Sequence, residues 1–492
     1  MNFRVPTRIL PFFILFAGCA GTGIATRPDT PLEALRYDID RVLADSVFTP
    51  TRASVMIVSL DRGDTLYERD SKILMRPASN MKLLTTSTAL KILGTGYVFH
   101  TSVFADSLTP DGTVNGNLYL KGMGDPDLTI YNLDTLSRQM KSIGIKKVTG
   151  NIVADASYFD DLSWGEGWMW DDEPYSFQAS ISALSVNKNC VKVTVIPGFL
   201  PGDPVQASFE PQTSYVTLLN TARTVADTAI EPLKVTRLFK DRLNVILVQG
   251  EIVAKPDTVE ELVTVWRPEL YAATLFREIL SRDSILVGGQ PTIGITPPST
   301  IELAIHRWPI DTMMVNLNKE SDNLSAENTL KLISVARGGI PGSARHGLTQ
   351  VKEILSTFGI DTTSFYVVDG SGVSHYNLIT ADLLVKLLRG MSQQPELFPL
   401  FYQSLPIAGV DGTLKTRMRN SPATGNLRAK TGSIGGVSSL SGYVTTRDGE
   451  RLAFSMLMQN FILPSRHYRN AQDAIGILLA NFSRRGSATA SR

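Results

Sequence analysis

The pattern of apolar residues changes twice along this chain, and this change limits the possible folds more than any other feature of the sequence. Helix-like and strand-like segments follow one another up to about residue 98 and again from about Met313. Between about 99 and 298 short alternating strands dominate, helices are expected to be rare, and Pro and Gly interrupt the pattern repeatedly. We therefore predict one α/β domain formed by both ends of the chain. A β-rich insertion of two small domains is predicted to divide this domain in the sequence. The length of 492 residues agrees with this prediction, since it is too great for one ordinary domain.

The segments at the two ends predict the elements of the α/β domain. Apolar residues recur on one face of a helix over 31–43, and an Asp-rich turn joins strands over 53–60 and 65–67. An apolar helix is predicted over 83–93. The later segment predicts helices over 325–335, 351–358 and 383–391, strands over 438–444 and 452–458, and an amphipathic helix over 468–482.

Charge and histidine placement exclude two classes of function. The formal net charge is +1 and no run of Lys and Arg stands out, so the chain lacks the basic stripe on which nucleic-acid binding depends. The five His residues are scattered, without HExxH or paired-Cys spacing. We predict no nucleic-acid partner, no metal site and no cofactor.

The first residues are typical of an export signal. Arg4 and Arg8 precede an apolar run over 9–17 that ends in small residues, which predicts a signal peptide over residues 1–18. This run is shorter than the roughly 20 residues that a spanning helix needs. Residues 15–19 resemble a bacterial lipobox, so Cys19 is predicted to carry lipid, with a plain signal peptide as the alternative. Membrane contact is then expected only through this anchor, and the location is predicted to be periplasmic, at the outer membrane.

The second cysteine has no predicted partner. If Cys19 is lipidated, Cys190 cannot form a disulfide. Cys190 opens an alternating segment over 190–195 that predicts a strand, so we interpret it as a small buried side chain.

Ser79 and Lys82 form the first motif with chemical potential. A Ser and a Lys three positions apart on a helix share a face, so the amine can approach the hydroxyl. A Lys kept neutral by burial and nearby cations can take the proton of such a hydroxyl and activate it as a nucleophile. Residues 185–188 match the same S-x-x-K pattern but open no apolar helix, and we interpret them as a chance match.

Two further motifs lie in the later segment. Ser321-Asp322-Asn323 precedes a predicted helix and offers a hydroxyl for proton relay and an amide to hold a substrate carbonyl. Lys430-Thr431-Gly432-Ser433 precedes a predicted strand. Its Lys offers a cation and its Thr a hydroxyl for a carboxylate, its Gly allows a substrate backbone to come close, and the N–H groups of Ser433 and Ser79 can form an oxyanion hole.

These three motifs, in this order, are those of class A β-lactamases and penicillin-binding proteins. The stretch between Ser79 and Ser321 is too long for a class A β-lactamase, and no E-x-x-L-N motif occurs. The chain resembles the class C low-molecular-mass penicillin-binding proteins, a family of D-alanyl-D-alanine carboxypeptidases and endopeptidases. The resemblance runs from about residue 31 to 480 and extends to the stretches 122–126, 167–172, 182–187, 369–374 and 405–414.

The resemblance implies an α/β penicillin-binding, transpeptidase-like serine-hydrolase domain with a central antiparallel sheet. It implies a division into a catalytic domain over 29–97 and 311–485, an inserted domain II over 98–310, and a domain III nested at about 188–270. It also implies peptidoglycan stem peptides as substrates, an acyl-enzyme on Ser79 and inhibition by β-lactams.

The resemblance further implies a role for each motif residue. Lys82 would act as the base and Ser321 as the proton relay, and Asn323 would hold the substrate amide. Lys430 and Thr431 would bind the terminal carboxylate.

Substrate side-chain recognition is where this chain departs from its relatives. His375 follows the stretch 369–374 where several relatives carry an Arg for a side-chain carboxylate, and Gly435 stands where some have a longer side chain. Asp155 is expected to match an acidic residue that holds a side-chain amine. Two alternatives remain open at this point: a β-lactamase, which differs only in its deacylation rate, and a non-catalytic wall-binding lipoprotein of the same fold.

Overall fold

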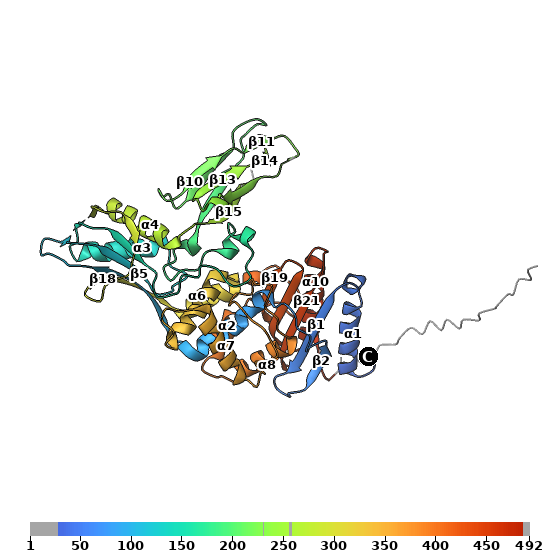
Figure 1. Ribbon diagram of the computed structural model, residues 1–492. Helices are drawn as coiled ribbons and strands as arrows, with labels where there is room; N and C mark the ends of the chain where they lie inside the picture. Colours follow the sequence, from blue (N-terminus) through green and yellow to red (C-terminus); the bar gives the residue numbers. More distant parts are fainter. Residues whose placement is uncertain (1–27, 230, 255–257, 486–492) are drawn as a thin grey trace, which may run out of the picture.

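The computed structural model describes residues 28–229, 231–254 and 258–485. Figure 1 shows a large α/β body that contains both ends of the described chain, and two smaller bodies formed by its middle. The mixed α/β fold class with an antiparallel central sheet and a β-rich insertion is confirmed.

The sheet of the α/β body is antiparallel, with the strand order β19-β20-β21-β1-β2. The pairing of β1 with β21 joins the two ends of the chain, since Arg52 faces Gln459. β19 is one of the two edge strands, and apart from a bridge between Ile407 and Arg428 its outer side is not paired with any described strand. The five strands are β1 (Arg52–Ser59), β2 (Thr65–Arg69), β19 (Arg428–Ile434), β20 (Val437–Thr445) and β21 (Arg451–Gln459).

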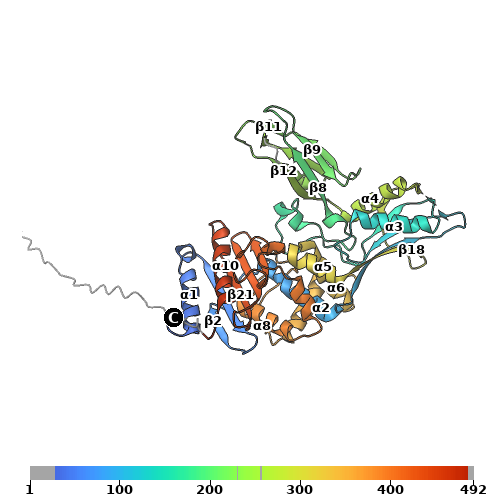
Figure 2. The ribbon, with the colours of Figure 1, turned by 180° about the vertical axis from the view of Figure 1, so that it is seen from behind.

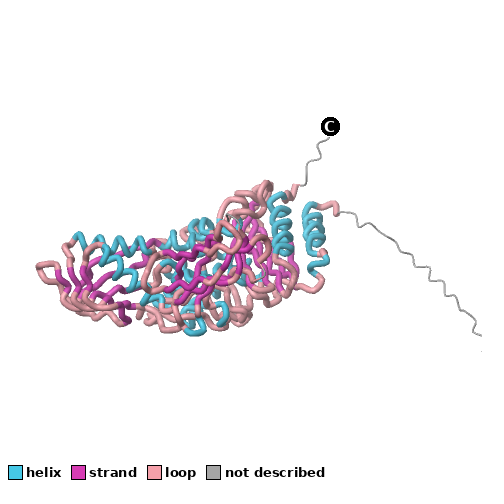
Figure 3. Tube along the Cα trace, turned by 90° about the horizontal axis from the view of Figure 1, so that it is seen from above, coloured by secondary structure: helices cyan, strands magenta, loops and turns pink. Residues whose placement is uncertain are grey.

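Helices cover both faces of this sheet. α1 (Pro31–Leu43) and α10 (Arg466–Asn481) lie side by side against one face, at one end of the molecule in Figure 3. α8 (Ala381–Ser392) packs on the opposite face. The alternation along β21 explains both contacts, because Phe454 belongs to the core under α1 and α10 whereas Leu457 belongs to the core under α8.

α2 (Met81–Leu93) is the central helix of the α/β body. Every residue from Met81 to Leu90 is buried, so this helix has packing partners all around it. It contacts α6 (Asn323–Ala336) and α7 (Ala344–Ser356), which brings the Ser79 segment next to the Ser321 segment. The shorter helices α5 (Ile310–Val315) and α9 (Phe398–Ser404) pack beside them.

The first inserted body is built on a mixed five-stranded sheet in the order β17-β7-β5-β3-β18. The helices α3 (Ile130–Ser142) and α4 (Pro268–Arg282) pack together and against it. The expectation that helices are rare in the middle of the chain is wrong for these two, and α3 buries Leu133, Leu136 and Met140 at helical spacing. The strands of this sheet are β3 (Val98–Ala105), β5 (Leu118–Gly122), β7 (Ile152–Asp155), β17 (Pro291–Ile293) and β18 (Ile301–Pro309). A smaller sheet in the order β16-β6-β4 consists of β4 (Thr113–Val114), β6 (Lys147–Val148) and β16 (Leu286–Val287).

The second inserted body consists of short strands in sheets ordered β15-β8-β9, β10-β13-β12 and β11-β14. The predicted strand at Cys190 is confirmed as β8, and the Cys190 thiol is free and buried. Burial raises its pKa to about 12, so it stays a protonated, unreactive thiol. The strands are β8 (Cys190–Ile196), β9 (Gln206–Glu210), β10 (Thr217–Asn220), β11 (Arg223–Val225), β12 (Lys234–Arg237), β13 (Val245–Gln249), β14 (Glu251–Val253) and β15 (Val259–Thr264).

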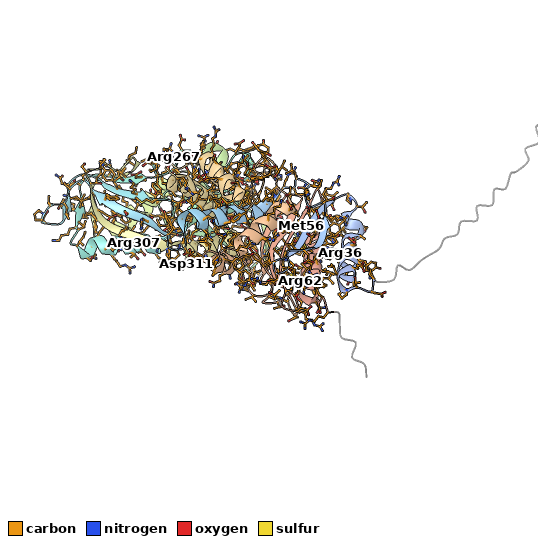
Figure 4. All side chains as sticks on the ribbon, turned by 90° about the horizontal axis from the view of Figure 1, so that it is seen from below. Arg36, Met56, Arg62, Arg267, Arg307 and Asp311 are labelled. Atoms are coloured by element: carbon orange, nitrogen blue, oxygen red, sulfur yellow. The ribbon has the colours of Figure 1, made fainter. Side chains whose placement is uncertain are left out.

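The same three bodies can be followed in the view from behind (Figure 2). The side-chain view in Figure 4 places Arg267 and Arg307 on the inserted part, away from Arg36 and Arg62 on the α/β body. We retain the division into domains over 29–97 with 311–485, 98–310 and about 188–270 as a proposal that accords with this arrangement of sheets. Within the described ranges, no helix is long and apolar enough to cross a bilayer. The predicted signal peptide and Cys19 lie outside these ranges.

Candidate active site

Ser79 lies in a strained turn at the head of the central helix. The turn is the 3-10 segment η2 (Ala78–Asn80), which leads directly into α2. Ala78 has a φ of 46°, in the left-handed region that side chains with a Cβ rarely adopt. The neighbouring Gly372 comes so close that a Cβ there would lie 1.9 Å from the Ala78 carbonyl oxygen. The turn is therefore held by packing from a distant loop, as is common where backbone strain is stored at a functional site.

Lys82 lies beside the Ser79 hydroxyl, on the first turn of α2. Its Nζ is 2.9 Å from Ser79 Oγ, 2.5 Å from Asn323 Oδ1 and 2.9 Å from the Ser371 carbonyl oxygen. Complete burial lowers the pKa of Lys82 to about 8, against the opposing charges of Asp322, Asp369 and Glu327. An amine with this pKa is substantially neutral in weakly alkaline solution and can accept a proton from Ser79.

Ser321 and Asn323 reach the same place from the start of α6. Ser321 has a φ of 62° and ends the π-helical segment η7 (Asn316–Glu320), so the chain reverses sharply before α6 begins. Asp322 then caps α6, with its Oδ1 accepting from the Ser325 N–H at 2.7 Å. This turn points the Asn323 amide oxygen at Lys82, while the Asn323 Nδ2 donates to the Phe177 carbonyl oxygen at 2.6 Å.

The Lys430 motif lies on the edge strand β19. The Lys430 Nζ donates to Ser321 Oγ at 2.8 Å, and burial together with the charge of Lys82 holds the pKa of Lys430 well below its usual range. Thr431 Oγ1 donates to Thr413 Oγ1 at 2.7 Å. A Cβ at Gly432 would lie 2.9 Å from the Ser79 nitrogen, so this position needs Gly because the nucleophile turn packs on it. The sequence suggested a different reason, the close approach of a substrate.

Buried carboxylates hold the loop that covers Lys82. Asp369 accepts hydrogen bonds from the N–H groups of Gly372 and Ser374, and Glu327 accepts from those of Gly370 and Ser371. Burial and the Asp369 charge raise the pKa of Glu327 to about 7. These contacts fix the Ser371 carbonyl oxygen that Lys82 binds.

A cavity of about 490 Å³ opens next to Ser79. Its walls come from α6, the end of β19, the loop after Asp369 and the inserted segment around Asp172. Gly435 lines it, and nothing lies within 4 Å of the place where a Cβ of Gly435 would be. The lining residues are Ser79, Met169, Asp172, Phe177, Asn323, Gly372, Val373, His375, Ser433, Ile434 and Gly435.

The structure brings most of the predicted site residues together, with one exception. Ser79, Lys82, Ser321, Asn323, Lys430, Thr431, Gly432 and Ser433 form one contiguous group, and His375 lines the cavity beside it. Asp155 does not take part. It is fully buried in β7, where it accepts hydrogen bonds from Ser157 and from the Thr296 N–H, and it does not line the cavity. The assignment of Asp155 to the site is therefore corrected.

Asp172 is the acidic residue that the sequence prediction missed. It lines the same cavity as His375. Partial burial and the charge of Asp171 raise its pKa, while burial and the charge of Arg76 lower the pKa of His375. Asp172 belongs to the stretch 167–172 that carried the family resemblance, which was the available signal. Within the described residues, no three His, Cys, Asp or Glu side chains gather in a way that could hold a metal ion.

The antiparallel sheet, the serine ahead of a buried helix and the two buried lysines define an active-site serine hydrolase of the penicillin-binding, transpeptidase-like class. Comparison with known proteins narrows this class. The family model of D-Ala-D-Ala carboxypeptidase 3 (S13) matches residues 35–482, and the chain belongs to that family.

Individual relatives agree with this assignment. D-alanyl-D-alanine carboxypeptidase of Actinomadura sp. (strain R39) is 35% identical over 490 aligned residues, which cover 96% of this chain and 89% of the relative. D-alanyl-D-alanine carboxypeptidase DacB of Haemophilus influenzae is 27% identical over 406 aligned residues, which cover 82% of this chain and 84% of that relative.

Solved structures agree as well. The crystal structure of penicillin binding protein 4 from H. influenzae superimposes with a TM-score of 0.81 at 25% identity, covering 91% of this chain and 99% of that one. Its complex with a β-lactam has a TM-score of 0.75 at 24% identity and shows the same fold.

Proposed function

We propose that this protein is a serine D-Ala-D-Ala carboxypeptidase, or a D,D-endopeptidase, that acts on peptidoglycan stem peptides. The observation that carries the proposal is the triangle of Ser79, Lys82 and Asn323, in which a buried amine of lowered pKa lies 2.9 Å from the serine hydroxyl. Membership of the carboxypeptidase family supports the choice of substrate.

In the acylation step, the Ser79 oxygen attacks the carbonyl carbon of the penultimate D-Ala, and the Ser79 proton passes to neutral Lys82. The N–H groups of Ser79 and Ser433 stabilise the oxyanion. The C–N bond then breaks, and the proton that Lys82 took passes through the Ser321 hydroxyl, which Lys430 binds, to the leaving amine, so that Lys82 is neutral again. Water hydrolyses the resulting ester with Lys82 as the base, which releases the shortened peptide and restores Ser79.

The cavity beside Ser79 suits the side chain of the third stem residue. Asp172 gives it one acidic group for an amine, and His375 gives it an imidazole where several relatives carry an Arg. We propose that a diamino acid occupies this cavity with its amine toward Asp172. This replaces the role that the sequence prediction gave to Asp155.

Labelling with penicillin and turnover of a muropeptide test the proposal together. The expected results are one penicilloyl adduct, mapped by peptide mass to Ser79, and release of D-Ala or of a cross-linked partner. Ser79→Ala should lose both at an unchanged melting temperature. An adduct on another residue, or none, contradicts the proposal. Rapid hydrolysis of penicillin without peptide turnover would instead identify a β-lactamase. If neither reaction is observed, the result favours a non-catalytic wall-binding protein.

We further propose export to the periplasm with lipid on Cys19. The support is the basic and apolar segment before it, and the lack of an Asp at Ala20 and Gly21 favours the outer membrane. The intact mass of membrane-extracted protein tests this, since a free N-terminus at any other residue contradicts it.

A further inference from the structure

The second S-x-x-K match, residues 185–188, forms a strained turn at the entry to the second inserted body. Asn187, Lys188 and Asn189 have φ values of 51°, 57° and 55°, which is three consecutive left-handed residues without a Gly among them. Such residues cost free energy and persist only where the surroundings hold them. Here Asn189 is fully buried and donates to the Ser180 carbonyl oxygen at 2.8 Å, while the Asn187 side chain accepts from the Ile130 N–H at 3.0 Å.

The strained turn directs Lys188 to the middle residue of the Ser321 motif. The Lys188 Nζ lies 3.2 Å from Asp322 Oδ2 and 3.4 Å from Asn316 Oδ1. Although burial opposes it, the Asp322 carboxylate raises the pKa of Lys188, with smaller contributions from Asp127 and Glu320, so this lysine is charged at neutral pH. The other Asp322 oxygen is bound by the Ser325 N–H at the start of α6. Asp322 is thus held from two sides, by α6 and by the inserted segment.

The residues on either side of Asp322 are in the active site. Ser321 receives the hydrogen bond from Lys430, and Asn323 receives the one from Lys82. A change in the backbone at Asp322 would displace both neighbours. Ser321 could not absorb it, because its left-handed backbone conformation allows only a narrow range of dihedral angles.

The charge of Asp322 also acts on Lys82. Burial lowers the pKa of Lys82, and Asp322, Asp369 and Glu327 all raise it against that burial. Lys188 offsets the Asp322 charge from the side of the inserted segment.

We propose that Lys188 is a positioning residue of the active site. From the inserted segment it holds Asp322, and through it Ser321 and Asn323, in the arrangement that acylates Ser79. The sequence analysis interpreted residues 185–188 as a chance match, but Lys188 from this stretch then supports the catalytic residues through Asp322. The inference rests on the proposed function, since it concerns the same acylation reaction.

Acylation by a chromogenic cephalosporin between pH 6 and 9.5 tests the inference, with melting temperatures measured in parallel. Lys188→Met should lower the acylation rate constant at pH 7 by about tenfold and move the midpoint of its rise to higher pH, because the uncompensated Asp322 charge raises the pKa of Lys82. Lys188→Arg should restore most of the rate. Lys192→Met is the matched control, since Lys192 lies four residues later and pairs only with the exposed Glu210 and Glu260 among the described residues.

Coupling to Asp322 separates positioning from simple stability. The double variant Lys188→Met with Asp322→Asn should acylate no more slowly than Asp322→Asn alone, because the lysine then has no carboxylate to hold. Two results overturn the inference: wild-type kinetics in Lys188→Met, or a loss that follows melting temperature with an unchanged pH profile and no rescue by Arg. Failure of the wild-type protein itself to be acylated on Ser79 would refute the proposed function and this inference with it.

Discussion

Lys82 is the side chain whose protonation decides when Ser79 can react. Burial lowers its pKa to about 8, and only the neutral amine can take the serine proton. The acylation rate should therefore rise with pH between 6 and 9, with a midpoint near 8. Stopped-flow measurement with a chromogenic cephalosporin checks this. Lys82→Met should abolish the reaction, whereas Lys91→Met, on the same helix and bonded to Gln394, should keep the wild-type profile. A flat profile would contradict the assignment of Lys82 as the base.

Asp172 allows a test of side-chain recognition. If it binds the amine of a diamino acid, Asp172→Asn should lower kcat/KM for a substrate with a free amine about tenfold, or roughly 1–2 kcal/mol. The same substrate with an acetylated amine should be turned over equally by both proteins. Asp155→Asn, in the buried site of β7, should not change the ratio between the two substrates. An equal loss on both substrates in Asp172→Asn would contradict amine recognition.

His375 predicts a pH-dependent contact with a side-chain carboxylate. Burial and the Arg76 charge lower its pKa, so the imidazole is neutral at pH 8 and gains charge only as the pH falls toward 6. The preference for a free carboxylate over its amide should increase over that interval. His375→Arg should raise kcat/KM for the free acid by a factor equivalent to about 1–2 kcal/mol of transition-state stabilisation. It should also remove the pH dependence of the preference for the free carboxylate over its amide. If the ratio of kcat/KM values is the same in both proteins at pH 6 and 8, His375 does not contact that carboxylate.

For single residues, the sequence predicted the catalytic side chains better than it predicted which side chains line the cavity. The catalytic candidates could be named from the sequence because each belongs to a short motif with a fixed order of residue types. These residues are Ser79, Lys82, Ser321 and Lys430. The sequence analysis named Asp155, which ends the buried strand β7, and missed Asp172, which lines the cavity. The position of Asp172 depends on the path of the inserted segment beside the α/β body, which residue spacing alone does not predict.

The approach of β19 to the nucleophile turn is the contact between elements that the site depends on. A Cβ at Gly432 would lie 2.1 Å from Ser439 Oγ and 2.8 Å from the Pro77 carbonyl oxygen, and these two atoms are hydrogen-bonded to each other. Gly432→Ala should therefore displace the turn and lower the acylation rate constant about 100-fold, with a lower melting temperature. Penicillin labelling kinetics and a thermal melt check this. Gly96→Ala is the control, since a Cβ there meets nothing within 4 Å.

Elements with strong local patterns were predicted closely. The helix over 31–43 is confirmed as α1, and the strands over 53–60 and 452–458 are confirmed as β1 and β21 within one or two residues at each end. The turn before α2 was not foreseen, because a left-handed Ala78 has no sequence signature and depends on packing against Gly372. Helices α3 and α4 were missed since short strands and turns around them dominated the pattern.

On the scale of the whole molecule, the insertion completes the active site. Phe177 binds Asn323, Lys188 binds Asp322, and Trp168 donates to Asp369 at 3.1 Å, all from one inserted segment over 168–188. These contacts join residues more than a hundred positions apart. The sequence predicted that an insertion exists, but its docking on the catalytic body follows from tertiary packing alone.

A buried carboxyl group between β5 and α3, in the first inserted body, predicts a pH-dependent stability. Asp125 is 1% exposed, its Oδ1 accepts from the Asp127 N–H, and its Oδ2 lies 3.8 Å from His306 Nε2 with no hydrogen-bond partner among the described residues. Burial raises the pKa of Asp125 to about 7, with the Asp127 charge adding to the shift, and burial lowers the pKa of His306. The carboxyl group therefore binds its proton more tightly in the folded protein than in the unfolded chain.

The sign of this linkage leads to a test on the intact protein. A folded-state pKa above the unfolded value of 3.8 gives a contribution to stability that is complete below that value and is lost as the pH rises through about 7. Asp125→Asn is neutral at every pH, so its melting temperature should match the wild type near pH 3, below the unfolded value, and exceed it by several degrees at pH 8. The free-energy difference at pH 8 is at most about 4 kcal/mol. Thermal melts at both pH values and constant ionic strength check this, with the exposed Asp227→Asn as the control. A shift of equal size at pH 3 and pH 8 would show that Asp125 acts on stability through packing rather than through its proton.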